Sequence, residues 1–329
     1  DGINPDDFSG DWVTPLMYDP NNQMSIFTMT NILYRSDDFG STWTTLGNSM
    51  FSGNIQNAAI AENNSNIIAV SDYNRLKISN DGGLTFTEIT QGLPNQFITD
   101  IAFDPNNDDI IIVVYGTYGN NNQKIYISTN QGGNWQNITH NLGNMPIRSV
   151  VIDHTDDSTI YVGAEIGVYK KSMTDSSWEL FNENLPNTTV MELEVVYGSN
   201  TLRGTTWGRG LWEYSIAGRE NYPSILKTSI SNQPTMTQPK EGIEQFVTST
   251  IEYEGELNSV YVEWSTESSS ETIQMSNSEN NIWISNSAIP NFEAGTKVFF
   301  KVFAQSVSGQ SSETYRFMYQ VRENILCTP

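Results

Sequence analysis

The chain of 329 residues has almost none of the residues that build redox or metal sites. It contains one cysteine, Cys327, and two histidines, His140 and His154. One cysteine cannot close a disulfide within the chain, and neither histidine stands at a spacing typical of metal ligands. We therefore expect no cysteine nucleophile and no metal centre. Cys327 is either a free thiol or the partner of a cysteine in a neighbouring domain.

Positive charge is also scarce. The chain has 16 lysines and arginines against 38 aspartates and glutamates, which gives a formal net charge of -22. A field of this sign repels phosphate backbones and anionic lipid headgroups. Nucleic acids and membrane surfaces are therefore excluded as expected partners, whereas cations and neutral ligands are compatible with the charge.

Long hydrophobic runs are missing as well. No stretch reaches the roughly 18 to 20 apolar residues that a membrane helix needs, so we expect no membrane insertion. The first residues, Asp-Gly-Ile-Asn-Pro, do not have the pattern of a signal peptide. The sequence is interpreted as a processed or excised piece of a longer parent, whose other domains are expected partners.

An eight-residue motif repeats along the first two thirds of the chain. Three copies read Ser-x-Asp/Asn-x-Gly-x-x-Trp/Phe, and a fourth copy lacks the glycine and is one residue shorter: Ser36 to Trp43, Ser79 to Phe86, Ser128 to Trp135 and Ser172 to Trp178. Short apolar segments flank each copy, and the repeat recurs every 43 to 49 residues. A four-stranded unit of this length is typical of a propeller blade.

The motif resembles the Asp-box of sialidases, sortilin-type propellers and xyloglucanase-like glycoside hydrolases. The resemblance implies a structural role on the face away from the ligand. The carboxylate or amide bonds its own turn, the glycine provides a positive φ, and the aromatic ring wedges between blades. The residues assigned to this role are Ser36, Asp38, Gly40, Trp43, Ser79, Asp81, Gly83, Phe86, Ser128, Asn130, Gly132, Trp135 and Trp178.

We predict an all-β chain that begins with an Asp-box β-propeller segment over residues 1–217, with four full blades and a partial fifth. The last blade carries no box and ends near Ser215. In the family, the missing outer strand comes from the N-terminal side. Residues 1–10 contain Pro5 and lack alternation, so we expect them not to pair with Leu211 to Tyr214. Two alternatives remain, a five-bladed ring and part of a larger propeller, and we favour the second.

A second domain is expected over residues 240–323, where strand-like segments alternate apolar and polar residues. The run around Ala288 to Val302 resembles the immunoglobulin-like or fibronectin-like modules of large secreted bacterial proteins, which implies a β-sandwich. Residues 218–239 have the composition of a linker or edge strand, and 324–329 are interpreted as a tail into a next domain.

Signatures of catalysis are weak. A sialidase needs three converging arginines, and the propeller segment offers only a few scattered ones. Xyloglucanase-like enzymes use paired carboxylates between two propellers, of which one partial copy is present. Acidic pairs such as Asp108-Asp109 and Asp156-Asp157 can contact calcium but lack the spacing of a calcium loop, so no cofactor is expected.

The repeat places one set of loops at the opposite end of the blades from the boxes. Their ligand-face candidates combine aromatic and polar side chains, which suits contact with sugars or peptides: Asp72, Tyr73, Tyr118, Glu165, Trp207 and Arg209. The competing interpretation is that Trp207 packs between blades and that the asparagine run after Tyr118 is a solvated hairpin tip.

Two functions stay open. The first is a non-catalytic binding or architectural region of a large secreted or cell-surface bacterial protein, with a propeller face that binds glycan or a protein ligand. The alternative is a fragment of a carbohydrate-active glycoside hydrolase whose cleft needs further blades upstream.

Overall fold

The computed structural model describes residues 3, 14–47, 50–119, 122–155, 158–231 and 238–323. In this described part, β-strands carry nearly all of the regular structure, with one short 3-10 helix, η2 (His140–Leu142). The chain divides into two compact units. The first comprises residues 1–195 and 202–214, and the second comprises residues 196–201 and 215–329. Each is described by itself.

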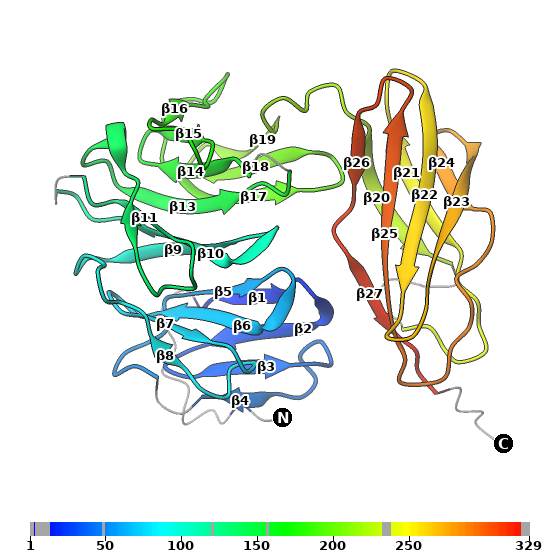
Figure 1. The fold of residues 1–329 in the computed structure, drawn as a ribbon, viewed down its shortest axis with the longest axis horizontal. Helices are drawn as coiled ribbons and strands as arrows, with labels where there is room; N and C mark the ends of the chain where they lie inside the picture. Colours follow the sequence, from blue (N-terminus) through cyan, green and yellow to red (C-terminus); the bar gives the residue numbers. More distant parts are fainter. Residues whose placement is uncertain are drawn as a thin grey trace. The chain divides into compact units, whose positions relative to one another are not determined.

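The first unit is a five-bladed β-propeller in which every blade is an antiparallel sheet in simple chain order (Figure 1). Four sheets have four strands and the fifth has three. They are β1 (Leu16–Asp19), β2 (Asn22–Met29), β3 (Leu33–Ser36) and β4 (Thr44–Leu46); β5 (Asn57–Ala61), β6 (Asn64–Ser71), β7 (Leu76–Ser79) and β8 (Thr87–Glu88); β9 (Ile98–Asp104), β10 (Asn107–Tyr115), β11 (Ile125–Ser128) and β12 (Gln136–Asn137); β13 (Ile147–Ile152), β14 (Ile160–Ala164), β15 (Gly167–Lys171) and β16 (Glu179–Leu180); and β17 (Val190–Val196), β18 (Thr201–Thr206) and β19 (Gly210–Ser215). The expectation of four full blades and a partial fifth is confirmed.

In each of the first four blades, the later part of the second strand is buried on both faces, which explains its mainly apolar sequence. In β10, the segment Ile111 to Tyr115 is fully buried because neighbouring blades cover the sheet on both sides. Three apolar cores result, one between each consecutive pair of the first four blades. Packing of sheet against sheet is therefore the main stabilisation of this unit.

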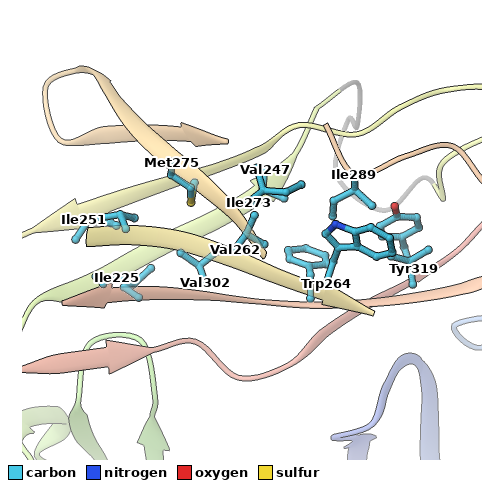
Figure 2. Packing of buried hydrophobic residues seen from close by; sticks show 14 of the residues in the cluster. Ile225, Val247, Ile251, Val262, Trp264, Ile273, Met275, Ile289, Val302 and Tyr319 are labelled. Atoms are coloured by element: carbon cyan, nitrogen blue, oxygen red, sulfur yellow. The ribbon is translucent and has the colours of Figure 1, made fainter. Parts of the chain in front are cut away.

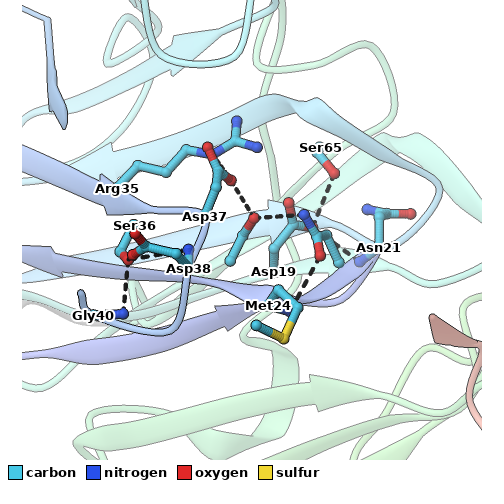
Figure 3. A network of polar contacts seen from close by, with 11 residues as sticks. Asp19, Asn21, Met24, Arg35, Ser36, Asp37, Asp38, Gly40 and Ser65 are labelled. Atoms are coloured by element: carbon cyan, nitrogen blue, oxygen red, sulfur yellow. Dashed lines mark hydrogen bonds and ion pairs between the residues drawn. The ribbon is translucent and has the colours of Figure 1, made fainter. Parts of the chain in front are cut away.

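Asparagines at the turn between the first and second strands tie each blade to the next. Asn21 Nδ2 donates to the carbonyl oxygen of Ala61 (2.9 Å), and Asn63 Nδ2 donates to that of Pro105 (2.9 Å). Asn106 Nδ2 donates to that of Thr155 (3.3 Å). Buried Asp19 strengthens the first link, because its Oδ1 accepts from Ser65 Oγ (2.9 Å) of the next blade (Figure 3).

The second unit is one continuous, nearly closed sheet that curls around a single core. Its strands are β20 (Ser224–Ile230), β21 (Val247–Glu252), β22 (Leu257–Ser265), β23 (Ser270–Glu279), β24 (Ile282–Ser285), β25 (Lys297–Ser306), β26 (Ser311–Glu313) and β27 (Phe317–Gln320). The long strand β23 pairs with β22 through its first half and with β24 through its second half. This change of partner bends the sheet over the core.

Alternation within these strands produces the core. In β25, Val298, Phe300 and Val302 point inward while the residues between them are less buried. Figure 2 shows Val302 with Val262 and Trp264 among the side chains that fill the space between the two halves of the sheet. The period of two seen in the sequence thus becomes one apolar and one polar face.

One sequence-based boundary agrees with the structure in part and another differs from it. Residues 218–239 were expected as a linker or edge strand, and within them β20 is an edge strand that pairs with β21 along its whole length and buries Ile225 in the core. The turn between β17 and β18 belongs to the second unit, where the carbonyl oxygen of Gly198 accepts from Ile225 N (2.7 Å). The expected absence of pairing by residues 1–10 lies outside the described residues, as does Cys327.

Candidate functional site

The boxes form closed hydrogen-bonded turns. In the first box, Asp38 Oδ1 accepts from Thr42 N (2.7 Å) and Asp38 Oδ2 accepts from Thr42 Oγ1 (2.7 Å). Gly40 N donates to Ser36 Oγ (2.7 Å) (Figure 3). Gly40 has a φ of +91°, which an L side chain rarely adopts. These bonds from Thr42 lower the pKa of Asp38 to about 2. The carboxylate is thus engaged in its own turn.

The second and third boxes repeat this geometry. Asp81 Oδ1 accepts from Thr85 N (2.9 Å), and Asn130 Oδ1 accepts from Asn134 N (2.9 Å). The side-chain bond from Thr85 and then its backbone bond lower the pKa of Asp81 to about 2. An amide replaces the carboxylate in the third box without loss of the turn, so the chemistry needed is acceptance of a hydrogen bond.

The aromatic residues of the boxes do not all behave alike. The indole Nε1 of Trp135 donates to the carbonyl oxygen of Ile89, and that of Trp178 donates to the carbonyl oxygen of Ile138, each at 2.8 Å and each in the preceding blade. Trp43 instead donates to Gly40 of its own box (3.1 Å). The expected inter-blade position is thus supported for Trp135 and Trp178, whereas the indole of Trp43 bonds within its own box.

The loops at the opposite end of the blades bring two of the sequence candidates together. Glu165, in the turn between β14 and β15, accepts from Arg148 Nη2 (2.6 Å) and from Thr189 Oγ1 (3.2 Å). The bond from Arg148 is the main cause of a lowered pKa for Glu165, and a bond from Tyr118 contributes. Glu165 is therefore ionised at neutral pH, in contact with the loop that carries Tyr118.

Trp207 lies in the turn between β18 and β19 and is 74% exposed. The interpretation that it packs between blades is therefore wrong. Its backbone N donates to the carbonyl oxygen of Thr189 (2.9 Å), the same residue whose hydroxyl donates to Glu165. Tyr118 is 72% exposed and Ile166 is also exposed. We name this set the loop-face cluster: Tyr118, Arg148, Glu165, Ile166, Thr189 and Trp207.

Of the remaining candidates, Asp72 and Tyr73 lie in another turn, and Arg209 shares the turn of Trp207. Asp72 is buried and accepts from Arg75 and Asn74 within its own turn, so its carboxylate serves the turn. Tyr73 is exposed and lies against Phe97, with ring centroids 4.9 Å apart. Arg209 is exposed, and its carbonyl oxygen accepts from Trp212 Nε1 (2.9 Å). In the described part of the chain, neither Asp72 nor Tyr73 bonds to a side chain of the loop-face cluster.

The arginines of the propeller are held by different carboxylates, which separates them. Arg35 pairs with Asp37, Arg75 with Asp72, Arg148 with Glu165, and Arg203 with Glu213. The pairs belong to four different blades. This distribution does not match an arginine triad that grips one carboxylate.

Two acidic residues near the middle of the unit escaped the sequence analysis. Asp100 on β9 accepts from Val150 N and Ile101 N, each at 2.8 Å. Burial raises the pKa of Asp100 to about 8, and the carboxylate of Glu192 on β17 adds to the rise. Burial and then Glu194 also raise the pKa of Glu192. No local motif marks this pair, because 92 residues separate its members.

Lys124 is a buried cation that holds the loop of Tyr118. Its side chain is fully buried, and Nζ donates to Gln96 Oε1 (3.3 Å) and to the carbonyl oxygen of Thr117. Gln96 Oε1 also accepts from Thr117 Oγ1 (2.8 Å). Burial lowers the pKa of Lys124. The sequence analysis did not identify this role of Lys124.

The described residues contain no group of three or more His, Cys, Asp or Glu side chains arranged to hold a metal ion. Nor do they include a helix with the length and hydropathy to cross a bilayer. Asp156 and Asp157, considered as calcium contacts, lie outside the described residues.

Comparisons with known proteins agree with the propeller that the repeated motif predicts. The family model described as Sortilin, neurotensin receptor 3, matches residues 31–192. A xyloglucanase from a Paenibacillus species is 28% identical in an alignment of 175 residues, and the match covers 44% of this chain and 17% of the relative. The matched region is thus about a sixth of the relative's length.

Solved structures with a similar fold include two glycoside hydrolases of family GH74. The Niastella koreensis enzyme is 17% identical with a TM-score of 0.48, and the match covers 90% of this chain and 58% of that one. The Xanthomonas campestris xyloglucanase is 14% identical with a TM-score of 0.49, and it covers 90% and 52%. Residues 31–192 therefore match a sortilin-type, Asp-box propeller model, and the chain has a xyloglucanase among its relatives.

Proposed function

We propose that this chain is a non-catalytic binding and architectural region of a larger extracellular protein, and that its loop-face cluster binds glycan. The observation that carries the proposal is a pair of large exposed rings linked to the ionised Glu165: Tyr118 bonds to Glu165, and the backbone of Trp207 bonds to Thr189, whose hydroxyl donates to Glu165. Exposed rings cover the apolar faces of sugars, and a fixed carboxylate accepts from their hydroxyl groups.

The contacts around Glu165 support a role in ligand binding more than a role in the stability of the fold. Arg148 and Thr189 fix the position of Glu165 by hydrogen bonds, so little side-chain freedom is lost when a ligand binds. The net charge of -22 favours a neutral ligand over an anionic one. A glycan without acidic groups fits both features.

A glycan array with the labelled chain, followed by calorimetry on the bound glycan, tests this proposal. We expect Trp207→Ala and Tyr118→Ala each to weaken binding about tenfold or more, because exposed aromatic anchors carry most of the binding free energy of such sites. Tyr18→Ala is the matched control, because Tyr18 is an exposed ring on the first blade. Binding that neither variant changes would reject the loop-face cluster, and no binding at all would reject the glycan.

The alternative is a glycoside hydrolase fragment, and the xyloglucanase relative supports it about equally. The specific observation in its favour is the raised pKa of Asp100, at about 8, beside Glu192. A carboxyl that stays protonated at neutral pH can act as a general acid. Release of reducing sugar from xyloglucan by the intact chain, lost in Asp100→Asn, would favour the enzyme; no release would favour the binding role.

Two further expectations accompany the proposal, one on the second unit and one on the location of the protein. The second unit is proposed as an immunoglobulin-like or fibronectin-like spacer, which the paired halves of its sheet around one core support. Secretion or display at a bacterial cell surface is proposed from the acidic composition and the xyloglucanase relative. Other domains of the parent are the proposed protein partners.

A further inference from the structure

A cavity of about 530 Å³ opens between the fourth and fifth blades, and all of its lining residues belong to the first unit. Sites for small organic ligands have volumes of about 300 to 1,000 Å³, so this cavity is large enough for one. Its lining includes four buried aliphatic side chains: Val168, Val190, Leu193 and Leu202. The cavity therefore offers an apolar floor to a small molecule.

Three aromatic side chains also line the cavity: Phe181, Trp212 and Tyr214. The rings of Phe181 and Tyr214 stand nearly perpendicular, at 76°, with centroids 5.8 Å apart, and thus form a corner. The face of an aromatic ring carries partial negative charge and attracts cations. A lining with several rings therefore favours a cation over an anion.

The chain itself places one ammonium group on these rings. Lys170 Nζ lies 5.6 Å from the centroid of the Phe181 ring, within the range of a cation–π contact. The same nitrogen lies 3.9 Å from Glu179 Oε2. Rings and carboxylates of this cavity thus already act together on a cation.

The charge of the lining has the same preference. Three carboxylates, those of Glu179, Glu183 and Glu213, stand against the single ammonium group of Lys170 among the described lining residues. Glu213 pairs with Arg203, whereas no ion pair of Glu183 occurs in the described part of the chain. Glu183 Oε2 accepts from the hydroxyl of Tyr214 (2.6 Å), which holds the carboxylate beside the aromatic corner. The lining is therefore anionic where the rings meet.

We propose that this cavity binds a small organic cation, namely a quaternary ammonium group carried on an apolar body. The ammonium group lies in the corner of Phe181 and Tyr214 beside Glu183, and the apolar body packs on the aliphatic floor. Methyl groups on the nitrogen cannot donate hydrogen bonds to water, so such a cation exchanges water for ring faces at low cost. The lining shares no residue with the loop-face cluster, so this site is independent of the proposed glycan site.

A ligand-observed NMR titration of the intact chain with three probes of one shape tests the proposal. The probes are para-(hydroxymethyl)phenyltrimethylammonium, its neutral isostere para-tert-butylbenzyl alcohol, and the anion para-tert-butylbenzoate. We expect saturable binding of the ammonium probe and at least about tenfold weaker binding of the neutral isostere, because only the cation interacts with ring faces and carboxylates. The anion should bind most weakly, and added salt should weaken the ammonium probe alone.

Charge variants of the chain locate the site. Glu183→Gln keeps an acceptor for the hydroxyl of Tyr214 and removes one charge, so it should weaken the ammonium probe about two- to fivefold and leave the neutral isostere unchanged. Glu88→Gln is the matched control, because it removes the same charge from β8, an exposed outer strand of the second blade. Lys170→Gln removes the resident cation and should tighten binding of the ammonium probe, which mere damage to the fold would not do.

A variant of the ring wall tests the apolar contacts. Trp212 is 37% exposed, so Trp212→Ala should keep the fold, as checked by circular dichroism, and weaken both the ammonium probe and its neutral isostere. Three results would overturn the proposal. They are the absence of saturable binding by the ammonium probe, equal affinity for the neutral isostere, and an ammonium affinity that neither Glu183→Gln nor Trp212→Ala changes.

Discussion

Removal of the indole of Trp178 is expected to be the most damaging single change in the propeller. Trp178 is 3% exposed, and its Nε1 donates to the carbonyl oxygen of Ile138 (2.8 Å) across the boundary between the third and fourth blades. Its backbone N and O are both bonded to Asn141. Trp178→Ala therefore opens a cavity in that core and removes the partner of a buried carbonyl.

The expected loss is about 3 to 5 kcal/mol, the range for large aromatic residues replaced by alanine in a core. Trp135 makes the same type of bond but is only partly buried, so Trp135→Ala should cost less, roughly 2 kcal/mol. Trp43 bonds only within its own box, and Trp43→Ala should cost about 1 kcal/mol or less. Trp178→Phe is the matched control; it keeps a ring and loses the donor, for about 1 kcal/mol.

Urea denaturation followed by circular dichroism measures this series, and thermal melts give a second readout. For a unit of this size, 1 kcal/mol corresponds to a shift of roughly 2 to 4 °C in Tm. The order Trp178, Trp135, Trp43 depends only on the presence and packing of a preceding blade. Equal losses for Trp178→Ala and Trp43→Ala would refute the inter-blade account.

Three further changes test other parts of the structure. The folded-state pKa of Asp81 is depressed to about 2, so the contribution of this carboxylate to stability is present above pH 4 and is lost as the pH falls towards 2. Asp81→Asn should flatten this acid dependence of stability, and an unchanged acid midpoint would contradict the expectation. The pKa of Asp100 is raised to about 8 in the folded chain, so this carboxyl ionises first in the unfolded chain and wild-type stability falls as the pH rises from 4 to 8. Asp100→Asn should therefore gain stability relative to wild type between pH 5 and 8. A stability difference between the two proteins that stays constant over this range would argue against the raised pKa. A fragment of residues 219–323 should fold alone, whereas 238–323 should be unstable by NMR because it lacks β20 and Ile225; equal behaviour of the two fragments would place β20 outside the folding unit.

The number and order of the blades were predictable from the sequence, because a local sequence motif marks each of the first four blades. The box is a turn closed by bonds within eight residues, and it recurs at a period that one four-stranded sheet requires. The absence of a box near Ser215 likewise predicted the three-stranded fifth sheet, which the structure has. Alternation by two in residues 297–306 predicted β25 and its inward residues for the same local reason.

Tertiary structure alone decided what identical motifs do. Trp43 and Trp178 occupy the same position in their boxes, yet the indole of Trp178 donates to Ile138 of the preceding blade, about 40 residues away, and that of Trp43 donates to Gly40 of its own box. The sequence placed Trp207 in a loop, but it could not show whether the side chain is exposed or buried, because that depends on how the adjacent loops pack. The pKa of Asp100 depends on Glu192, and the strand β20 depends on its partner β21. Each of these features arises from residues distant in sequence that only the packed fold brings together.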